Sequence, residues 1–93
     1  MFDRVMRLFR KKIQSREYVV TVHANEEMDD DSLSVFDVES TVLSGTIVER
    51  QRDRATREHK YVVHGEDTEG VGAGVVAKLG PTGRMVIITV FRL

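Results

Sequence analysis

The second half of the chain is a succession of short strands, whereas the first half is mostly helical. Residues 46–52, 59–65, 75–79 and 85–92 are rich in Val, Ile and Tyr and are separated by polar or Gly-containing turns, which is typical of antiparallel strands. The last of these strands is apolar on both faces, so it is expected at a central or covered position. Helices first and a strand meander last, within 93 residues, predict an α+β fold. Its N-terminal helices are expected to pack on one face of a four- to five-stranded, mainly antiparallel sheet.

The segment between residues 17 and 45 contains one strand and two helices. Residues 18–22 favour a strand because they are rich in Val and Tyr, and the acidic residues 24–31 predict a helix that frays at its acidic end. Ser34 and Asp37 resemble a capping box with Asp in place of Glu, and Gly45 ends that helix. The residues expected to contribute most to the core are Val20, Val22, Val38, Val42, Leu43, Ile47, Val62, Val75, Ile87 and Val90.

Residues 1–16 are predicted to form a basic amphipathic helix ahead of a single α+β domain at residues 17–93. The apolar residues that recur at helical spacing are Phe2, Val5, Met6, Phe9 and Ile13. This helix docks on the domain, or it binds nucleic acid, a protein or an anionic membrane surface. A transit peptide is disfavoured because hydroxyl residues are scarce and Asp3 is present.

The charges are strongly segregated although the net charge is only −1. Residues 1–16 carry six bases and one acid, residues 17–45 carry eight acids and no base, and residues 46–64 carry five bases and three acids. Separate positive and negative patches steer charged partners toward a protein. The alternative is that the two kinds of segment pair with each other or lie in solvent.

Composition excludes several classes of site. The chain has no cysteine, so it has no disulfide, thiol nucleophile or thiolate metal site, in keeping with a cytoplasmic location. His23, His59 and His64 lack the spacing of a zinc site, and the Gly-rich residues 70–74 precede a strand rather than a helix, unlike a dinucleotide loop. We therefore expect no metal and no cofactor. No apolar run approaches the ~20 residues that span a bilayer, so no membrane-spanning segment is expected, and a membrane is not among the predicted partners.

A basic hairpin at residues 46–65 is the candidate nucleic-acid site. Its cations are Arg50, Arg52, Arg54, Arg57 and Lys60. Arg50, Arg52 and Arg54 share parity, so on a strand they would line one face and follow a phosphate backbone. Tyr18, Tyr61 and Phe91 are the strand aromatics that offer base stacking. The alternative is that the charged hairpin keeps an exposed sheet edge from aggregating.

The order of these pieces resembles the bacterial family called domain of unknown function 4258, over roughly residues 17–93. The resemblance is carried by Tyr18 to Ala24, Met28, Ser34, Asp37 and Val38, Gly45, Tyr61, Gly65, and Ile88 to Phe91. The family is similar to the small ribonuclease folds of barnase, EndoU, colicin and RelE, and its members often look like toxins of toxin–antitoxin pairs. The resemblance implies metal-free cleavage or binding of RNA, with a small antitoxin protein as a partner.

The chain departs from the family pattern at two cationic positions. That pattern reads His-Ala-x-x-Arg-Met with a second Arg three residues later, whereas Glu27 and Asp31 stand at those positions here. Two missing cations weaken the stabilisation of a pentacoordinate phosphate. Either the cations come from the hairpin, or catalysis is lost and a binding function remains.

If the chain cleaves RNA, a ribose 2′-hydroxyl attacks the adjacent phosphate. His23 is expected to act as general base or acid, and Glu27, four residues later, as its orienting partner or as the base itself. Arg52 or Arg54 is expected to hold the phosphate, and Tyr61 to orient or stack a base. A second hypothesis needs no histidine: a non-catalytic module binds a small protein through the acidic residues 26–39 or the N-terminal helix.

Overall fold

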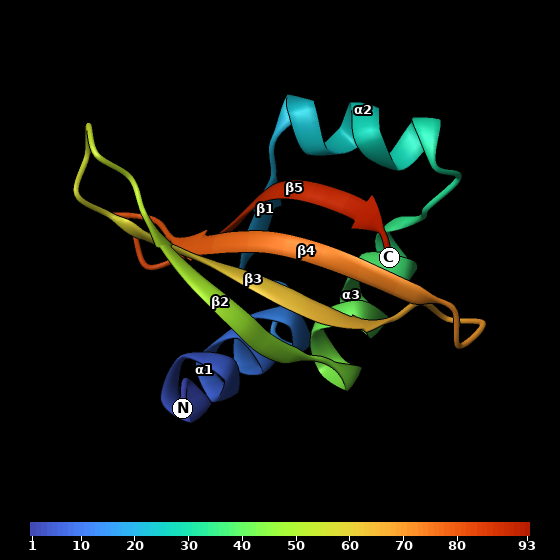
Figure 1. Cartoon of the computed structure of the whole chain (residues 1–93), viewed down its shortest axis with the longest axis horizontal. Helices are drawn as coiled ribbons and strands as arrows, with labels where there is room; N and C mark the ends of the chain where they lie inside the picture. Colours follow the sequence, from blue (N-terminus) through green and yellow to red (C-terminus); the bar gives the residue numbers. More distant parts are fainter.

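The computed structural model describes all residues from 1 to 93 and contains three helices and five strands (Figure 1). In chain order they are α1 (Asp3–Gln14), β1 (Tyr18–Val20), α2 (Val22–Asp30), α3 (Val35–Ser44), β2 (Thr46–Arg52), β3 (His59–Glu66), β4 (Gly72–Leu79) and β5 (Met85–Arg92). None of the three helices combines the length and the apolar character that crossing a bilayer requires.

The strands form one sheet in the order β1-β5-β4-β3-β2. Strands β2 to β5 make an antiparallel meander, and β1 adds to β5 in parallel, with Tyr18 opposite Met85 and Val20 opposite Ile87. This architecture confirms the predicted α+β fold with its helices ahead of a mainly antiparallel sheet. The apolar strand β5 lies at an interior position, as its sequence indicates.

The core lies between the helices and one face of the sheet. Register places Val63 of β3 opposite Val75 of β4, and Val75 opposite Val90 of β5, so these three side chains share the helix-covered face. The helical residues buried against them are Met6, Phe9, Ile13, Ala24, Met28, Val38 and Val42. The other face of the sheet, called the open face below, carries no helix (Figure 1).

Two of the predicted core residues lie at the surface. Val22 is 76% exposed and Leu43 is 40% exposed. For Val22 the reason is that Thr21 ends the strand: the Thr21 hydroxyl accepts a hydrogen bond from the backbone N–H of Ala24 at 3.1 Å and caps α2. Val22 therefore belongs to the first turn of a helix and points to solvent, so its assignment to the core was wrong.

Helix α1 is docked on the domain. Phe9 is fully buried, and its ring lies 5.8 Å from that of Tyr61 in an edge-to-face arrangement. The Arg10 guanidinium donates a hydrogen bond to the carbonyl oxygen of Gly45 at 2.8 Å, which ties the helix to the start of β2. Residues 1–16 and 17–93 thus share one hydrophobic core.

Helix α2 covers the part of β5 that β1 leaves unpaired. Beyond Ile87 the short strand β1 offers no partner, and hydrogen bonds with the side chains of Thr21 and Glu27 take its place. The Thr21 hydroxyl donates to the carbonyl of Ile88 at 3.2 Å, and the Glu27 carboxylate accepts from the backbone N–H of Val90 at 3.0 Å. A helix, rather than a longer strand, therefore closes this edge.

Helix α3 begins with the predicted capping box. Asp37 accepts a hydrogen bond from the backbone N–H of Ser34 at 2.9 Å, and the Ser34 hydroxyl accepts one from the N–H of Asp37 at 3.2 Å. Asp37 also accepts from the backbone and the hydroxyl of Thr68, in the β3–β4 turn. The Ser34 backbone N–H and the Thr68 groups together hold the pKa of Asp37 well below its usual range.

Candidate nucleic-acid interface

Arginines of α1 and of β2 lie around Phe2, at the start of α1. The Arg50 guanidinium stands over the ring of Phe2, 5.5 Å from its centroid, and Phe2 meets Tyr61 of β3 edge-to-face at 5.8 Å. On the other side of α1, Val5 lines a hollow together with Arg57. Helix α1 thus bridges the strand end and the tip of the hairpin. We call the surface around Phe2 the basic face and define it by Arg7, Arg10, Arg50 and Arg52.

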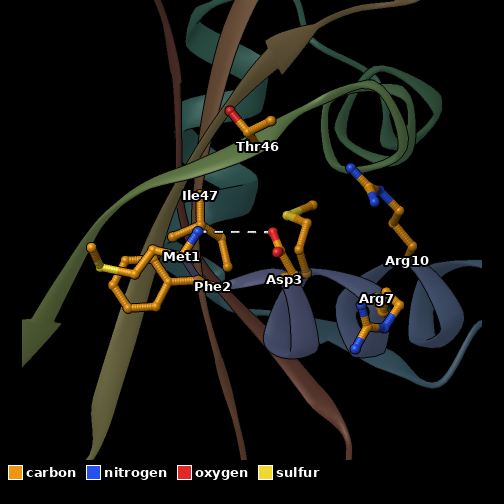
Figure 2. A pocket seen from close by; sticks show the side chains of 8 residues that line it. Met1, Phe2, Asp3, Arg7, Arg10, Thr46 and Ile47 are labelled. Carbon is orange, nitrogen blue, oxygen red and sulfur yellow. Dashed lines mark ion pairs between the residues drawn. The ribbon is translucent and has the colours of Figure 1, made fainter.

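A hollow of about 440 Å³ lies between α1 and the start of β2, and Figure 2 shows the side chains that line it. Its lining residues are Met1, Phe2, Asp3, Met6, Arg7, Arg10, Thr46 and Ile47. Phe2 and Ile47 lie on one side, and Arg7 and Arg10 on the other, with the Asp3 carboxylate between them. Asp3 also forms an exposed ion pair with the terminal ammonium of Met1 at 3.9 Å.

The structure divides the five hairpin cations among three places. In the register of β2 and β3, Arg50 lies opposite Tyr61 and Arg52 lies opposite His59, so both arginines face the helix side of the sheet. Lys60 lies on the opposite, open face, where it lines a hollow with Lys78.

The remaining two cations lie in the turn at the hairpin tip. β2 ends at Arg52, so Arg54 is not on the strand and does not continue the parity of Arg50 and Arg52. Arg57 adopts a positive φ of 62°. Asp53 holds this turn together by accepting hydrogen bonds from the N–H groups of Ala55 and Thr56, and the Thr56 bond is the main reason that the pKa of Asp53 is lowered.

His23 and Glu27 come together at the opposite edge of the sheet. His23 Nε2 lies 3.4 Å from one carboxylate oxygen of Glu27, while the other oxygen accepts the N–H of Val90. The His23 side chain is 66% exposed. Tyr61 lies elsewhere, beneath α1 on β3, with β4 and β5 between it and β1, so about three strand spacings or ~14 Å separate the two sites. The three residues predicted to be catalytic do not form one cluster.

Two of the candidate stacking aromatics are engaged in packing. Tyr61 contacts Phe2 and Phe9, as described above. The Tyr18 hydroxyl donates a 2.6 Å hydrogen bond to Glu39, and burial, together with this bond, raises the pKa of Tyr18 to about 12.

Phe91, the third candidate aromatic, lies on the open face of the sheet, a surface that the sequence did not indicate. Phe91 lies on the open face over Gly74, where an added Cβ would stand 2.2 Å from the ring. Its ring meets that of His64 edge-to-face at 6.0 Å. Strand parity was the available signal, because it places His64 and Phe91 on the face opposite the core residues.

Acidic residues gather at the other end of the molecule. Asp29, Asp30 and Asp31 end α2, and Asp37 at the start of α3 binds the β3–β4 turn, which carries Asp67. Arg92 donates a hydrogen bond to the buried Asp67, and this bond is the main reason that the pKa of Asp67 is lowered. The end of α2 and the β3–β4 turn, which are distant in sequence, thus form an acidic end far along the sheet from the hairpin tip (Figure 1).

Comparison with known proteins gives one match. A family model described as "Domain of unknown function (DUF4258)" matches residues 20–92, from the end of β1 to the end of β5. The matched region leaves α1 outside it. No curated protein and no solved structure matches the chain.

Proposed function

The chain belongs to the family described as domain of unknown function 4258, and from this premise we propose that it is a toxin-like, RNA-directed protein that binds RNA on its basic face. The observation that carries the proposal is the convergence of α1 and β2. Arg7 and Arg10 of α1 line the same hollow as Thr46 and Ile47, and Arg50 stands over Phe2 of the α1 N-terminus.

Such a surface suits a phosphate backbone. Two segments that are some forty residues apart in sequence place guanidinium groups around Phe2, and guanidinium groups bind phosphate oxygens in a bidentate manner. The acidic residues of α2 and of the β3–β4 turn lie at the other end of the molecule, so they do not cancel this potential. The charge separation also orients the protein toward a polyanion.

Salt dependence tests this proposal. The affinity for a single-stranded RNA, measured by fluorescence anisotropy, should fall with salt with a log–log slope of about −0.7 per phosphate contact. The double variant Arg50→Gln/Arg52→Gln should flatten that slope by roughly 1.4 if both residues make contact. Arg16→Gln/Arg84→Gln is the matched control, because it removes two exposed cations outside the basic face and should leave the slope unchanged.

The outcomes separate the site from the function. An unchanged slope in the basic-face variant together with a flattened slope in the control would show that RNA binds outside the basic face. Absence of RNA binding by the intact protein would refute the proposed function. Deleting α1 is not a usable test, because Met6, Phe9 and Ile13 are part of the core.

The proposed function extends to metal-independent cleavage at His23, which lies at the sheet edge opposite the basic face, so the scissile phosphate would lie beyond the part of the strand that the arginines hold. The imidazole would take the proton of a ribose 2′-hydroxyl as its oxygen attacks the adjacent phosphorus, and the 5′-oxygen would leave and take a proton from water. The 3.4 Å approach of Glu27 to His23 supports this role, because a carboxylate orients a proton-transferring imidazole. RNA incubated with wild type and with His23→Ala in EDTA tests it. Equal background in both samples would end the enzymatic hypothesis and leave RNA binding in place.

The acidic end supports a second candidate function, a non-catalytic module that binds a small basic, antitoxin-like protein. Asp29, Asp30 and Asp31 are exposed and have no ion-pair partner. Replacing all three with Asn should abolish capture of such a partner, whereas His23→Ala should not affect it. Retained capture by the triple Asn variant would refute this alternative.

A further inference from the structure

We propose that the hollow between α1 and β2 holds one unpaired nucleotide of a single-stranded RNA, an inference that rests on the proposed RNA binding. The hollow has a volume of about 440 Å³, within the ~300–1,000 Å³ typical of small-molecule sites. Arg7 and Arg10 of the basic face line it (Figure 2), so a strand that follows these arginines would pass over it.

The two sides of the hollow match the two parts of a nucleotide. Phe2 and Ile47 supply an aromatic ring and aliphatic surface for a base. Arg7 and Arg10 lie on the other side and supply guanidinium groups for the attached phosphate.

The orientation of the polar groups is partly fixed in advance. Arg10 is held by its 2.8 Å hydrogen bond to the Gly45 carbonyl, so little side-chain entropy is lost when its remaining N–H groups bind an anion. Arg7 is exposed and makes no hydrogen bond or ion pair within the protein, so its charge is free. The Asp3 carboxylate between the two sides can accept a hydrogen bond from a base N–H.

This geometry selects single strands over duplexes. A base within a duplex is stacked and paired, and extruding it costs a few kcal/mol, whereas a base in a single strand is free to enter. An arginine surface without a hollow would bind both forms through their phosphates. The wild type should therefore prefer a single-stranded RNA to a duplex of the same sequence.

The test compares two arginines of one helix. Arg7→Gln should weaken binding of a single-stranded RNA roughly tenfold, because it removes about one charge-assisted hydrogen bond. It should also remove most of the preference for single-stranded over double-stranded RNA. Arg4→Gln is the matched control: it removes the same charge from an exposed position of α1 that does not line the hollow. We expect it to weaken single-strand and duplex binding equally and only slightly.

Two further measurements keep the outcome clear. Phe2→Leu keeps an apolar side chain but removes the ring, so it should weaken single-strand binding and spare duplex binding, with a thermal melt to confirm the fold. Titration with adenosine or uridine monophosphate should shift the backbone NMR signals of Phe2, Thr46 and Ile47, more than inorganic phosphate does. Equal effects of Arg7→Gln and Arg4→Gln, with Phe2→Leu unchanged, would overturn the nucleotide site and leave RNA binding intact. No binding of either RNA would instead refute the proposed function.

Discussion

Glu27 is predicted to hold the edge of β5, and its role can be measured. Its carboxylate accepts the N–H of Val90 at 3.0 Å at a point where β1 no longer pairs with β5. Glu27→Ala removes the acceptor and leaves a partly buried N–H without a partner, which costs ~1–3 kcal/mol. In a domain of this size each kcal/mol lowers Tm by about 4–8 °C, so we expect a fall of roughly 4–24 °C.

Two companion variants separate hydrogen bonding from charge. Glu27→Gln keeps an oxygen in place to accept the Val90 N–H, so it should cost less than about 0.5 kcal/mol. Glu27→Arg introduces the arginine that the family pattern has at this position, but a guanidinium group cannot accept the Val90 N–H. It should therefore destabilise the fold at least as much as Glu27→Ala.

Thermal melts, together with amide hydrogen exchange at Val90, measure these effects. Exchange at Val90 should accelerate in the Ala and Arg variants and stay slow in the Gln variant, because only Gln retains the bond. The reasoning is refuted if Gln and Ala melt together and Val90 exchanges at one rate in all four proteins. Retained stability of Glu27→Gln with loss of RNA cleavage would additionally show that the carboxylate charge serves His23.

Further predictions concern the core and the acid response. Val42→Asp places an unpaired charge in a fully buried position and should largely unfold the domain, whereas Val22→Asp at an exposed position should change the free energy of unfolding by less than about 0.5 kcal/mol; chemical denaturation distinguishes them. Phe9→Ala should cost about 3–5 kcal/mol in the same assay, and a near-wild-type melt would show that α1 is not part of the core. The pKa of Asp37 is lower in the folded protein than in the unfolded chain. The ionised carboxylate therefore contributes its full stabilisation of the fold above the ordinary pKa of 3.8, and this stabilisation is lost as the pH falls toward the pKa of the folded protein. The difference in stability between wild type and Asp37→Asn should therefore shrink between about pH 5 and pH 2, and a constant difference would contradict the assigned hydrogen bonds.

The sequence predicted those elements whose signals are local. The α3 capping box was found because Ser34 and Asp37 bond to each other across a single turn, and Gly45 marks the end of that helix. The strands of the meander were found because alternating or continuous apolar residues lie between polar and Gly-containing turns. The end of β1 was missed because Thr21 is both a good strand residue and a good helix cap, and its bonds to Ala24 and Ile88 decide between them.

The candidate site was predicted in its parts but not in its arrangement. The sequence indicated the basic helix and the basic hairpin as two separate candidates for binding nucleic acid. In the structure they contact each other, because Arg50 of the hairpin lies over the ring of Phe2. Tyr61 was expected beside His23, yet burial beneath α1 places it at a different site. Strand parity by itself could not foresee that the strand would stop before Arg54.

The chain by itself determined its helices, its strands and the sign of charge on each, because propensity, capping and periodicity depend on residues a few positions apart. Only the tertiary structure decided which charged segments share a surface and which polar groups meet. Those contacts depend on how apolar faces pack across the sheet: the packing of Phe9 against Tyr61 holds α1 where Phe2 lies beneath Arg50 and where Arg7 faces the start of β2. Hydrophobic burial depends on the apolar area removed from water and not on the separation of the residues in sequence. The packing of the core therefore determines where the charged residues lie in space, and their spacing in sequence does not.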